Sequence, residues 1–177
     1  LITVATGWQA CTYDMEVIAI IGLVAAYVIP FMLSTGEGSP WALFSYISII
    51  NVGVMFISVK RYWRILFVSA YVSSWFIYGV VYRTLDFPET SDAVKLLVFL
   101  FINFVIFYVT FLAYKVKHKM IFQNFDIVYL LSNSFMFFGL GYNVMFNNET
   151  LASYVAWFSF ANALIHGIVA FILIKKN

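Results

Sequence analysis

Charged residues are scarce in this chain: Asp, Glu, Lys and Arg make up 10% of its 177 residues, against about 25% in an ordinary soluble domain. Hydrophobic residues make up 64%, and the mean hydropathy is +0.94. This composition argues against a water-soluble globular protein, because too few polar side chains are present to cover its surface. The net charge of +2 is also too small to indicate binding to nucleic acid.

Residues with metal or redox chemistry are few as well. The chain has two histidines and a single cysteine, Cys11, so no intrachain disulfide can form and a transition-metal site of His and Cys ligands is disfavoured. It also lacks a glycine-rich phosphate loop and a Gly-x-Ser-x-Gly nucleophile elbow. We therefore predict no metal site and no cofactor.

Long apolar runs are what the chain does have. Six runs of about 19 to 24 residues recur along it, and as helices they would measure about 28 to 36 Å, enough to cross the hydrocarbon core of a bilayer. They predict an all-α fold, a polytopic transmembrane helical bundle. The predicted spans lie near residues 15–33, 41–59, 64–82, 93–116, 126–146 and 151–174. Because the connections are short, we expect a single membrane domain over residues 1–177, built as antiparallel helical hairpins.

The basic residues are unevenly divided between the two ends of the predicted spans. Arg83 and Lys95 fall on the side opposite Asp14, where the first span begins. Eight fall on the side of Asp14: Lys60, Arg61, Arg64, Lys115, Lys117, Lys119, Lys175 and Lys176. Basic residues in short loops mark the cytoplasmic side of a membrane protein. We therefore expect both ends of this chain to face the cytoplasm.

The sixth predicted span carries the most informative polar pair. Asn162 and His166 are four residues apart, so they share one helix face, which must contact protein or water rather than lipid. His166 could relay protons, because histidine titrates near neutral pH. Hydrogen-bonded packing is the favoured alternative, since no other ionisable group lies in the middle of a predicted span. Beside the pair, Ser159, Ala163 and Gly167 form a small-residue stripe that predicts close helix packing.

Three further asparagines lie inside predicted spans: Asn51, Asn103 and Asn133. We interpret each as an interhelical hydrogen bond, worth about 0.6 to 2 kcal/mol, rather than as a ligand to a substrate. Together with Asn162 and His166, these residues are the candidate intramembrane polar site.

Charged residues at the ends of the spans allow two further interpretations. Asp86, Glu89 and Asp92 are the candidate acids for catalysis on the outer side, although loop acids of this kind more often begin a helix in water. The basic segment from Lys115 to Lys119 is expected to lie along the inner membrane surface, where its cations would meet anionic headgroups.

One stretch of the chain is similar to a known family. It contains Tyr27-Val-Ile-Pro30, Leu33-Ser-Thr-Gly-Glu-Gly38, Ala42-Leu-Phe-Ser-Tyr46, Asn51 and Lys60-Arg-Tyr-Trp-Arg64. Over Tyr27 to Tyr82, about a third of the chain, these pieces resemble the bacterial predicted-membrane-protein family known as domain of unknown function 2339. The resemblance implies a long inner-membrane protein with many spans, of which this chain, beginning at Leu1, would be an internal block. It implies no activity and no catalytic residues.

The sequence leaves three functions open. The favoured one is a structural or scaffolding domain of an integral membrane protein in the bacterial inner membrane. Its partners would be the lipid bilayer and the remaining spans of the parent protein, with homo-oligomerisation left open. The second is a transport domain for a neutral or lipidic solute, which would pass the buried Asn and His side chains. The third is a membrane enzyme acting on lipid-linked substrates through its outer acids; a protein that is not an enzyme is favoured.

Overall fold

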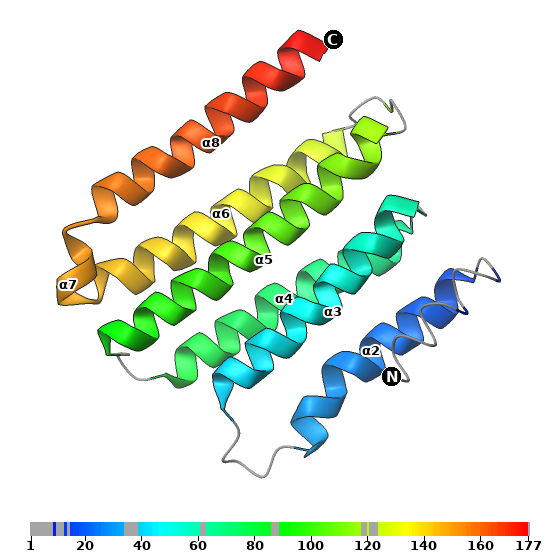
Figure 1. Ribbon diagram of the computed structural model, residues 1–177, viewed down its shortest axis with the longest axis horizontal. Coiled ribbons are helices and arrows are strands. Elements are labelled where there is room, and N and C mark those ends of the chain that lie inside the picture. The colour runs from blue at the N-terminus through cyan, green and yellow to red at the C-terminus, as the bar shows by residue number, and fades with distance from the viewer. Residues whose placement is uncertain are drawn as a thin grey trace.

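The fold is a bundle of long helices, as predicted. The computed structural model describes residues 9, 13, 15–33, 39–60, 63–85, 89–117, 120 and 124–176. Over these ranges it contains helices and no strand (Figure 1). The helices are α2 (Glu16–Leu33), α3 (Pro40–Lys60), α4 (Arg64–Thr84), α5 (Thr90–Lys117), α6 (Asn124–Phe146), α7 (Glu149–Ala152) and α8 (Val155–Lys176).

Four of the described helices are long and apolar enough to cross a bilayer. They are Pro40–Ser58, Arg64–Thr84, Thr90–Ala113 and Phe125–Phe146. The apolar stretches of α2 and α8 are shorter over the described residues, at Glu16–Met32 and Val155–Ile168. A helix is therefore present at each of the six predicted positions, and the division into six complete spans stays a prediction.

The start of the last predicted span, 151–174, is wrong. Residues 149–152 form the separate short helix α7, and α8 begins only at Val155. The Asn148 side chain caps α7 by accepting a hydrogen bond from the Leu151 N–H at 3.2 Å, which turns the chain before it re-enters the bundle. Asn148 is also the first residue of a glycosylation sequon, Asn148-Glu-Thr150, but in the structure its side chain accepts the capping hydrogen bond.

The helices lie side by side, with α2 at one edge of the bundle and α8 at the opposite edge (Figure 1). Their directions alternate, so α2 starts and α8 ends at the same end of the molecule. Helices α5 and α6 pack as the predicted antiparallel neighbours. The most extensive described contact, however, joins α3 to α5, which run parallel and are not consecutive. Consecutive hairpins are thus only part of the architecture.

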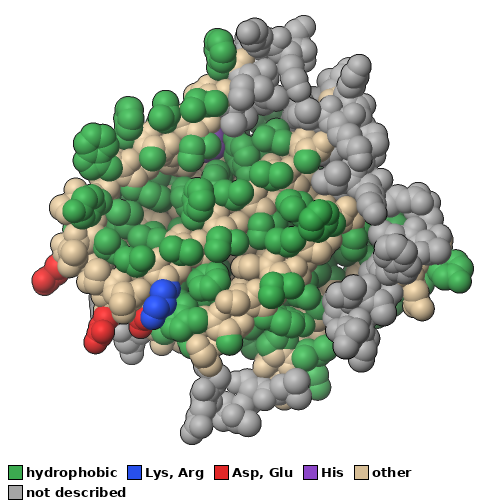
Figure 2. Space-filling view, viewed as in Figure 1, with side chains coloured by type: hydrophobic (Ala, Val, Ile, Leu, Met, Phe, Trp, Pro, Cys, Tyr) green, Lys and Arg blue, Asp and Glu red, His purple; other side chains and the backbone are tan. Residues whose placement is uncertain are grey.

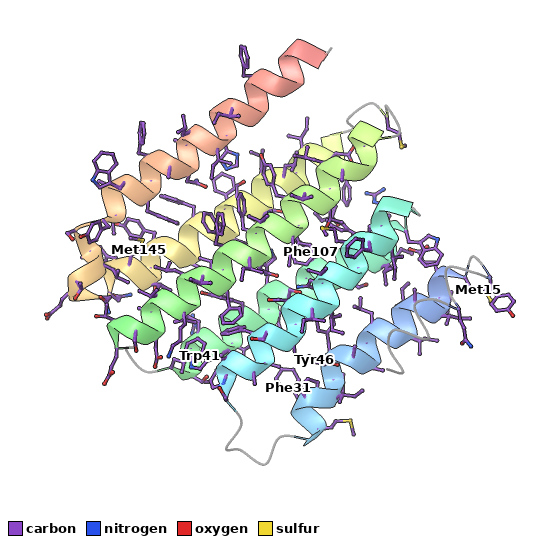
Figure 3. The ribbon with its side chains drawn as sticks, viewed as in Figure 1. Met15, Phe31, Trp41, Tyr46, Phe107 and Met145 are labelled. Carbon is purple, nitrogen blue, oxygen red and sulfur yellow. The ribbon has the colours of Figure 1, made fainter. Side chains whose placement is uncertain are left out.

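Aromatic side chains explain why α3 lies against α5. At the end of the bundle where α3 starts, the rings of Trp41 and Phe44 on α3 lie 6.4 and 5.4 Å from the ring of Phe99 on α5. Deeper in the bundle, Phe107 of α5 points inward and meets the ring of Tyr71 on α4 edge to face at 5.3 Å (Figure 3). Such offset and edge-to-face pairs add to the free energy gained by burying the rings.

The outer surface of the bundle is apolar. Large hydrophobic side chains stand exposed on every long described helix, among them Met32, Ile49, Phe76, Phe135 and Trp157, each at least 70% exposed. On the face shown in Figure 2 hydrophobic atoms predominate, and the described charged side chains gather at one margin. Since water would disfavour such a surface, the bundle sits in a lipid bilayer.

Gly141 brings α8 close to α6 and provides a test of their packing. A Cβ atom at this position would lie 2.5 Å from Phe158 Cζ and 3.2 Å from Leu100 Cδ2. Phe158 is itself confined by Phe137, whose ring is 5.3 Å away. We expect Gly141→Ala to lower the free energy of unfolding by about 1–3 kcal/mol, as overpacking does. Denaturation in lipid bicelles, followed by tryptophan fluorescence, measures this loss.

Gly139 is the matched control for this substitution, because a Cβ atom there would meet nothing within 4 Å. Gly139→Ala should leave stability unchanged or raise it by up to about 1 kcal/mol, since alanine favours a helix over glycine. Equal effects at the two glycines would show that α8 does not pack closely at Gly141.

Candidate functional site

Asn51 lies at the centre of a buried polar network that joins α2, α3, α4 and α5. Its amide nitrogen donates to Ser74 Oγ at 2.8 Å and to Asn103 Oδ1 at 3.1 Å. Tyr27 Oη donates to Asn51 Oδ1 at 2.5 Å and lies 3.0 Å from Ser74 Oγ. These four side chains are between 1% and 7% exposed. The predicted interhelical role of Asn51 and Asn103 thus agrees with the contacts that they make.

The protons of the three central side chains can be assigned to a closed ring of hydrogen bonds. Tyr27 donates to Asn51 Oδ1, Asn51 Nδ2 donates to Ser74 Oγ, and Ser74 donates back to Tyr27 Oη. The second amide proton of Asn51 is left for Asn103 Oδ1. The opposite amide orientation would place two oxygens, Asn51 Oδ1 and Asn103 Oδ1, against each other. A network satisfied in this way stabilises one arrangement of the helices.

Sequence reasoning missed two members of this network. In the sequence, Ala70 and Ser74 are four residues apart and indicate only a small helix face, and Tyr27 belongs only to the stretch that resembles the family. A tyrosine in the middle of an apolar run is a usable signal, because its hydroxyl needs a partner in lipid. Nothing in the spacing shows that this partner lies on α3 and α4.

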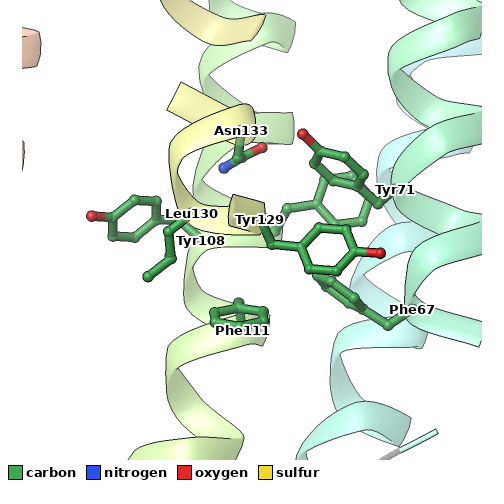
Figure 4. A pocket seen from close by; sticks show the side chains of 8 residues that line it. Phe67, Tyr71, Tyr108, Phe111, Tyr129, Leu130 and Asn133 are labelled. Atoms are coloured by element: carbon green, nitrogen blue, oxygen red, sulfur yellow. The ribbon is translucent and has the colours of Figure 1, made fainter. Parts of the chain in front are cut away.

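Asn133 lies outside the network, on α6. Its Nδ2 donates to the backbone oxygen of Phe104 on α5 at 3.1 Å, whereas its buried Oδ1 has no hydrogen-bond partner among the described residues. The side chain borders a cavity of about 10 Å³, room for about one water molecule. Figure 4 shows Tyr71 and Phe67 on one side of this cavity and Tyr108 on the other, with the Tyr108 hydroxyl directed outward.

Asn162 and His166 lie on α8, apart from the Asn51 network. Asn162 Oδ1 and His166 Nε2 are both buried, and neither has a hydrogen-bond partner in the part of the chain that the structure describes. The imidazole ring of His166 packs against the ring of Tyr108 on α5, with 6.1 Å between ring centroids. The five predicted polar residues therefore do not form one site: Asn51 and Asn103 belong to one group, and His166 lies beside Tyr108 in another.

The small-residue stripe on α8 is not covered by another described helix. Ala163 and Gly167 are exposed, and a Cβ atom at Gly167 would meet nothing within 4 Å. Ser159 donates to the backbone oxygen of Val155 in its own helix at 2.9 Å. Close packing along this stripe stays a prediction.

A comparison with models of protein families identifies the family of this chain. The model of the family described as predicted membrane protein (DUF2339) matches residues 1–177. The chain belongs to this family. The sequence motifs indicated a resemblance over residues 27–82. The family model extends it to all 177 residues of the chain. No curated protein and no solved structure matches it.

The end of the bundle where α2 starts contains a buried ion pair. Lys115 Nζ of α5 lies 2.6 Å from Asp126 Oδ2 of α6, and the two side chains are 3% and 2% exposed. The prediction that the Lys115 cation meets lipid headgroups is therefore wrong for this residue, because its ammonium group is held by a carboxylate inside the bundle. Lys119 lies outside the described residues.

Two other contacts are made at the same end of the bundle. The Glu16 carboxylate at the start of α2 accepts hydrogen bonds from the backbone N–H groups of Ile65 and Leu66, at 3.1 and 3.3 Å. It thereby caps the N-terminus of α4, where negative charge is favoured. The Arg64 guanidinium lies 3.5 Å from the ring centroid of Phe125, a cation–π contact between α4 and α6. Asp14 is outside the described residues.

The acids near the start of α5 do not form a catalytic group in the described part of the bundle. Asp92 Oδ1 is 2.8 Å from Lys95 Nζ, one turn along the same helix. The Glu89 backbone oxygen accepts hydrogen bonds from the first turn of α5, and Asp86 is not among the described residues. Within the described ranges, no three His, Cys, Asp or Glu side chains are placed to hold a metal ion.

Proposed function

We propose that this DUF2339 chain is a structural, scaffolding domain of a protein of the bacterial cytoplasmic membrane. The observation that carries the proposal is the Asn51 network. It uses buried polar side chains to tie four helices together, and it leaves none of the protons of Tyr27, Asn51 and Ser74 for a substrate. A transport path would need polar groups that water or a solute can reach.

The distribution of charge supports an orientation for this scaffold. Lys60, Arg64, Lys115, Lys117, Lys175 and Lys176 all belong to helix ends on the side where α2 starts and α8 ends. Basic residues concentrate on the cytoplasmic side of membrane proteins. We infer that both ends of the bundle face the cytoplasm.

Thiol accessibility in native membranes tests both inferences. In a Cys11→Ala background, Ser74→Cys replaces a 2% exposed hydroxyl of the network by a group of similar size. We expect a membrane-impermeant maleimide to leave this cysteine unmodified from either side, because position 74 is buried between four helices. Labelling of the folded protein at Ser74→Cys would show that water reaches the network, and would refute the scaffold function.

Two exposed positions serve as controls for the labelling. Glu149→Cys lies at the outer end of the bundle and should react in intact cells, since Glu149 is exposed. Met120→Cys lies at the inner end, where Met120 is 42% exposed, and should react only after the membrane is opened. The reverse pattern would show that the proposed orientation is wrong.

A further inference from the structure

The face of α8 that turns toward the bundle contains two buried polar atoms that no described residue satisfies. Asn162 Oδ1 and His166 Nε2 lack a hydrogen-bond partner there, and one helical turn separates the two residues. Burying a polar atom without a hydrogen bond carries a free-energy penalty, so such atoms in native proteins are normally paired. Two of them side by side on one helix face point to a binding site.

The position of these atoms follows from the packing around them. Phe158, one turn before Asn162, lies against Phe137 of α6 at 5.3 Å between ring centroids. His166, one turn after Asn162, lies against Tyr108 of α5 at 6.1 Å. Asn162 therefore lies between a contact with α6 and a contact with α5, in the seam where α8 meets the rest of the bundle.

The chemistry of this seam selects a class of ligand. The amide oxygen of Asn162 only accepts hydrogen bonds, His166 Nε2 accepts in one neutral tautomer, and the Tyr108 hydroxyl can donate or accept. Apart from His166 itself, no acidic or basic side chain lies at this depth on the described parts of α5, α6 and α8. A cation would thus lack a counter-charge in a medium of low dielectric, and an anion would find one only if His166 were protonated, so the seam favours an uncharged ligand.

We propose that Asn162 and His166, with Tyr108 packed against His166, bind a small uncharged molecule that donates hydrogen bonds through a hydroxyl group. Water and a small polyol share this chemistry. The bound molecule bridges α8 to α5 and completes the hydrogen bonding of the seam. This site is separate from the Asn51 network, so it does not depend on the scaffold function.

The sign of a stability change tests whether the seam is occupied. Asn162→Leu removes an acceptor and keeps a side chain of similar length. If the seam holds a bridging ligand, the substitution lowers the Tm of the full chain in lipid bilayers by about 2–4 °C, the shift typical of one lost interaction in a protein of this size. If the seam is empty, removing an unsatisfied buried amide raises the Tm, and the proposal is overturned.

Histidine nitrogen signals identify the ligand. In a His118→Gln variant, ¹⁵N-histidine labels His166 alone, and solid-state NMR in bilayers reports what lies at Nε2. Transfer of magnetisation from water protons to Nε2, lost in D₂O, would identify water. A saturable shift of this resonance on adding glycerol would identify a polyol. An Nε2 with no proton donor nearby, or one bonded directly to the Tyr108 hydroxyl, would overturn the proposal.

Discussion

Asn51→Leu should lower the free energy of unfolding by about 2–4 kcal/mol. The substitution removes the side chain that bonds Tyr27, Ser74 and Asn103, and it leaves their buried polar groups short of partners. Hydrogen bonds between transmembrane helices contribute about 0.6–2 kcal/mol each, and an unsatisfied buried polar group costs about 1–3 kcal/mol. Denaturant-induced unfolding in bicelles, followed by tryptophan fluorescence, gives the value.

Two further variants make this result interpretable. Tyr27→Phe removes a single hydroxyl from the same network and should lower the free energy of unfolding by about 1 kcal/mol. In the double variant Tyr27→Phe/Asn51→Leu, the loss should differ from the sum of the two single losses, because the two residues are in contact. Asn147→Leu, at an exposed asparagine of the turn after α6, should change stability by less than about 0.5 kcal/mol. If Asn51→Leu is no more harmful than Asn147→Leu, the network does not hold the four helices together.

Lys115→Met should destabilise the protein by about 3–5 kcal/mol. The variant takes away the ammonium group 2.6 Å from the Asp126 carboxylate, which is itself only 2% exposed. Breaking a buried ion pair from one side is strongly unfavourable, because the remaining carboxylate loses the ammonium group that faces it away from water. The double variant Lys115→Met/Asp126→Leu should recover most of the loss, since it buries neither charge. The same bicelle assay measures both.

Lys95→Met is the matched control for the ion pair. Lys95 and Asp92 also lie 2.8 Å apart, but their side chains are 49% and 35% exposed. An exposed pair contributes at most about 1 kcal/mol, so this variant should be nearly neutral. Similar losses for Lys95→Met and Lys115→Met would show that burial does not strengthen the Lys115–Asp126 ion pair.

Much of the fold could be predicted from the sequence because the deciding signals are local. An apolar run of bilayer length predicts a helix wherever it occurs, and each predicted span coincides with a described helix within a few residues, apart from the start of the last. The start of the last span is predicted wrongly because a helix cap, rather than hydropathy, determines it. Asn148 caps a short helix first, and hydropathy does not register a cap of this sort.

The candidate site was predictable only in part. Asn51 and Asn103 were expected to form interhelical hydrogen bonds, and they bond to each other. Their further partner Ser74 could not be found by spacing, because it is brought there by the packing of α4. The basic residues that follow Lys115 in the sequence predict that its side chain lies at the lipid surface. In the structure, this side chain instead forms an ion pair with Asp126.

By itself, the sequence determined that this protein is a multispan helical membrane protein, and the uneven distribution of its basic residues indicated an orientation. Both depend on properties of single segments: length, hydropathy and charge. The tertiary structure alone decided that α3 packs on α5, that Tyr27 closes the Asn51 network, and that Asn162 and His166 face a seam without partners among the described residues. The physical reason is that all these helices are apolar on most sides. Hydropathy therefore cannot choose between neighbours, and the choice is made by the shapes of aromatic rings and the few polar groups that must find one another.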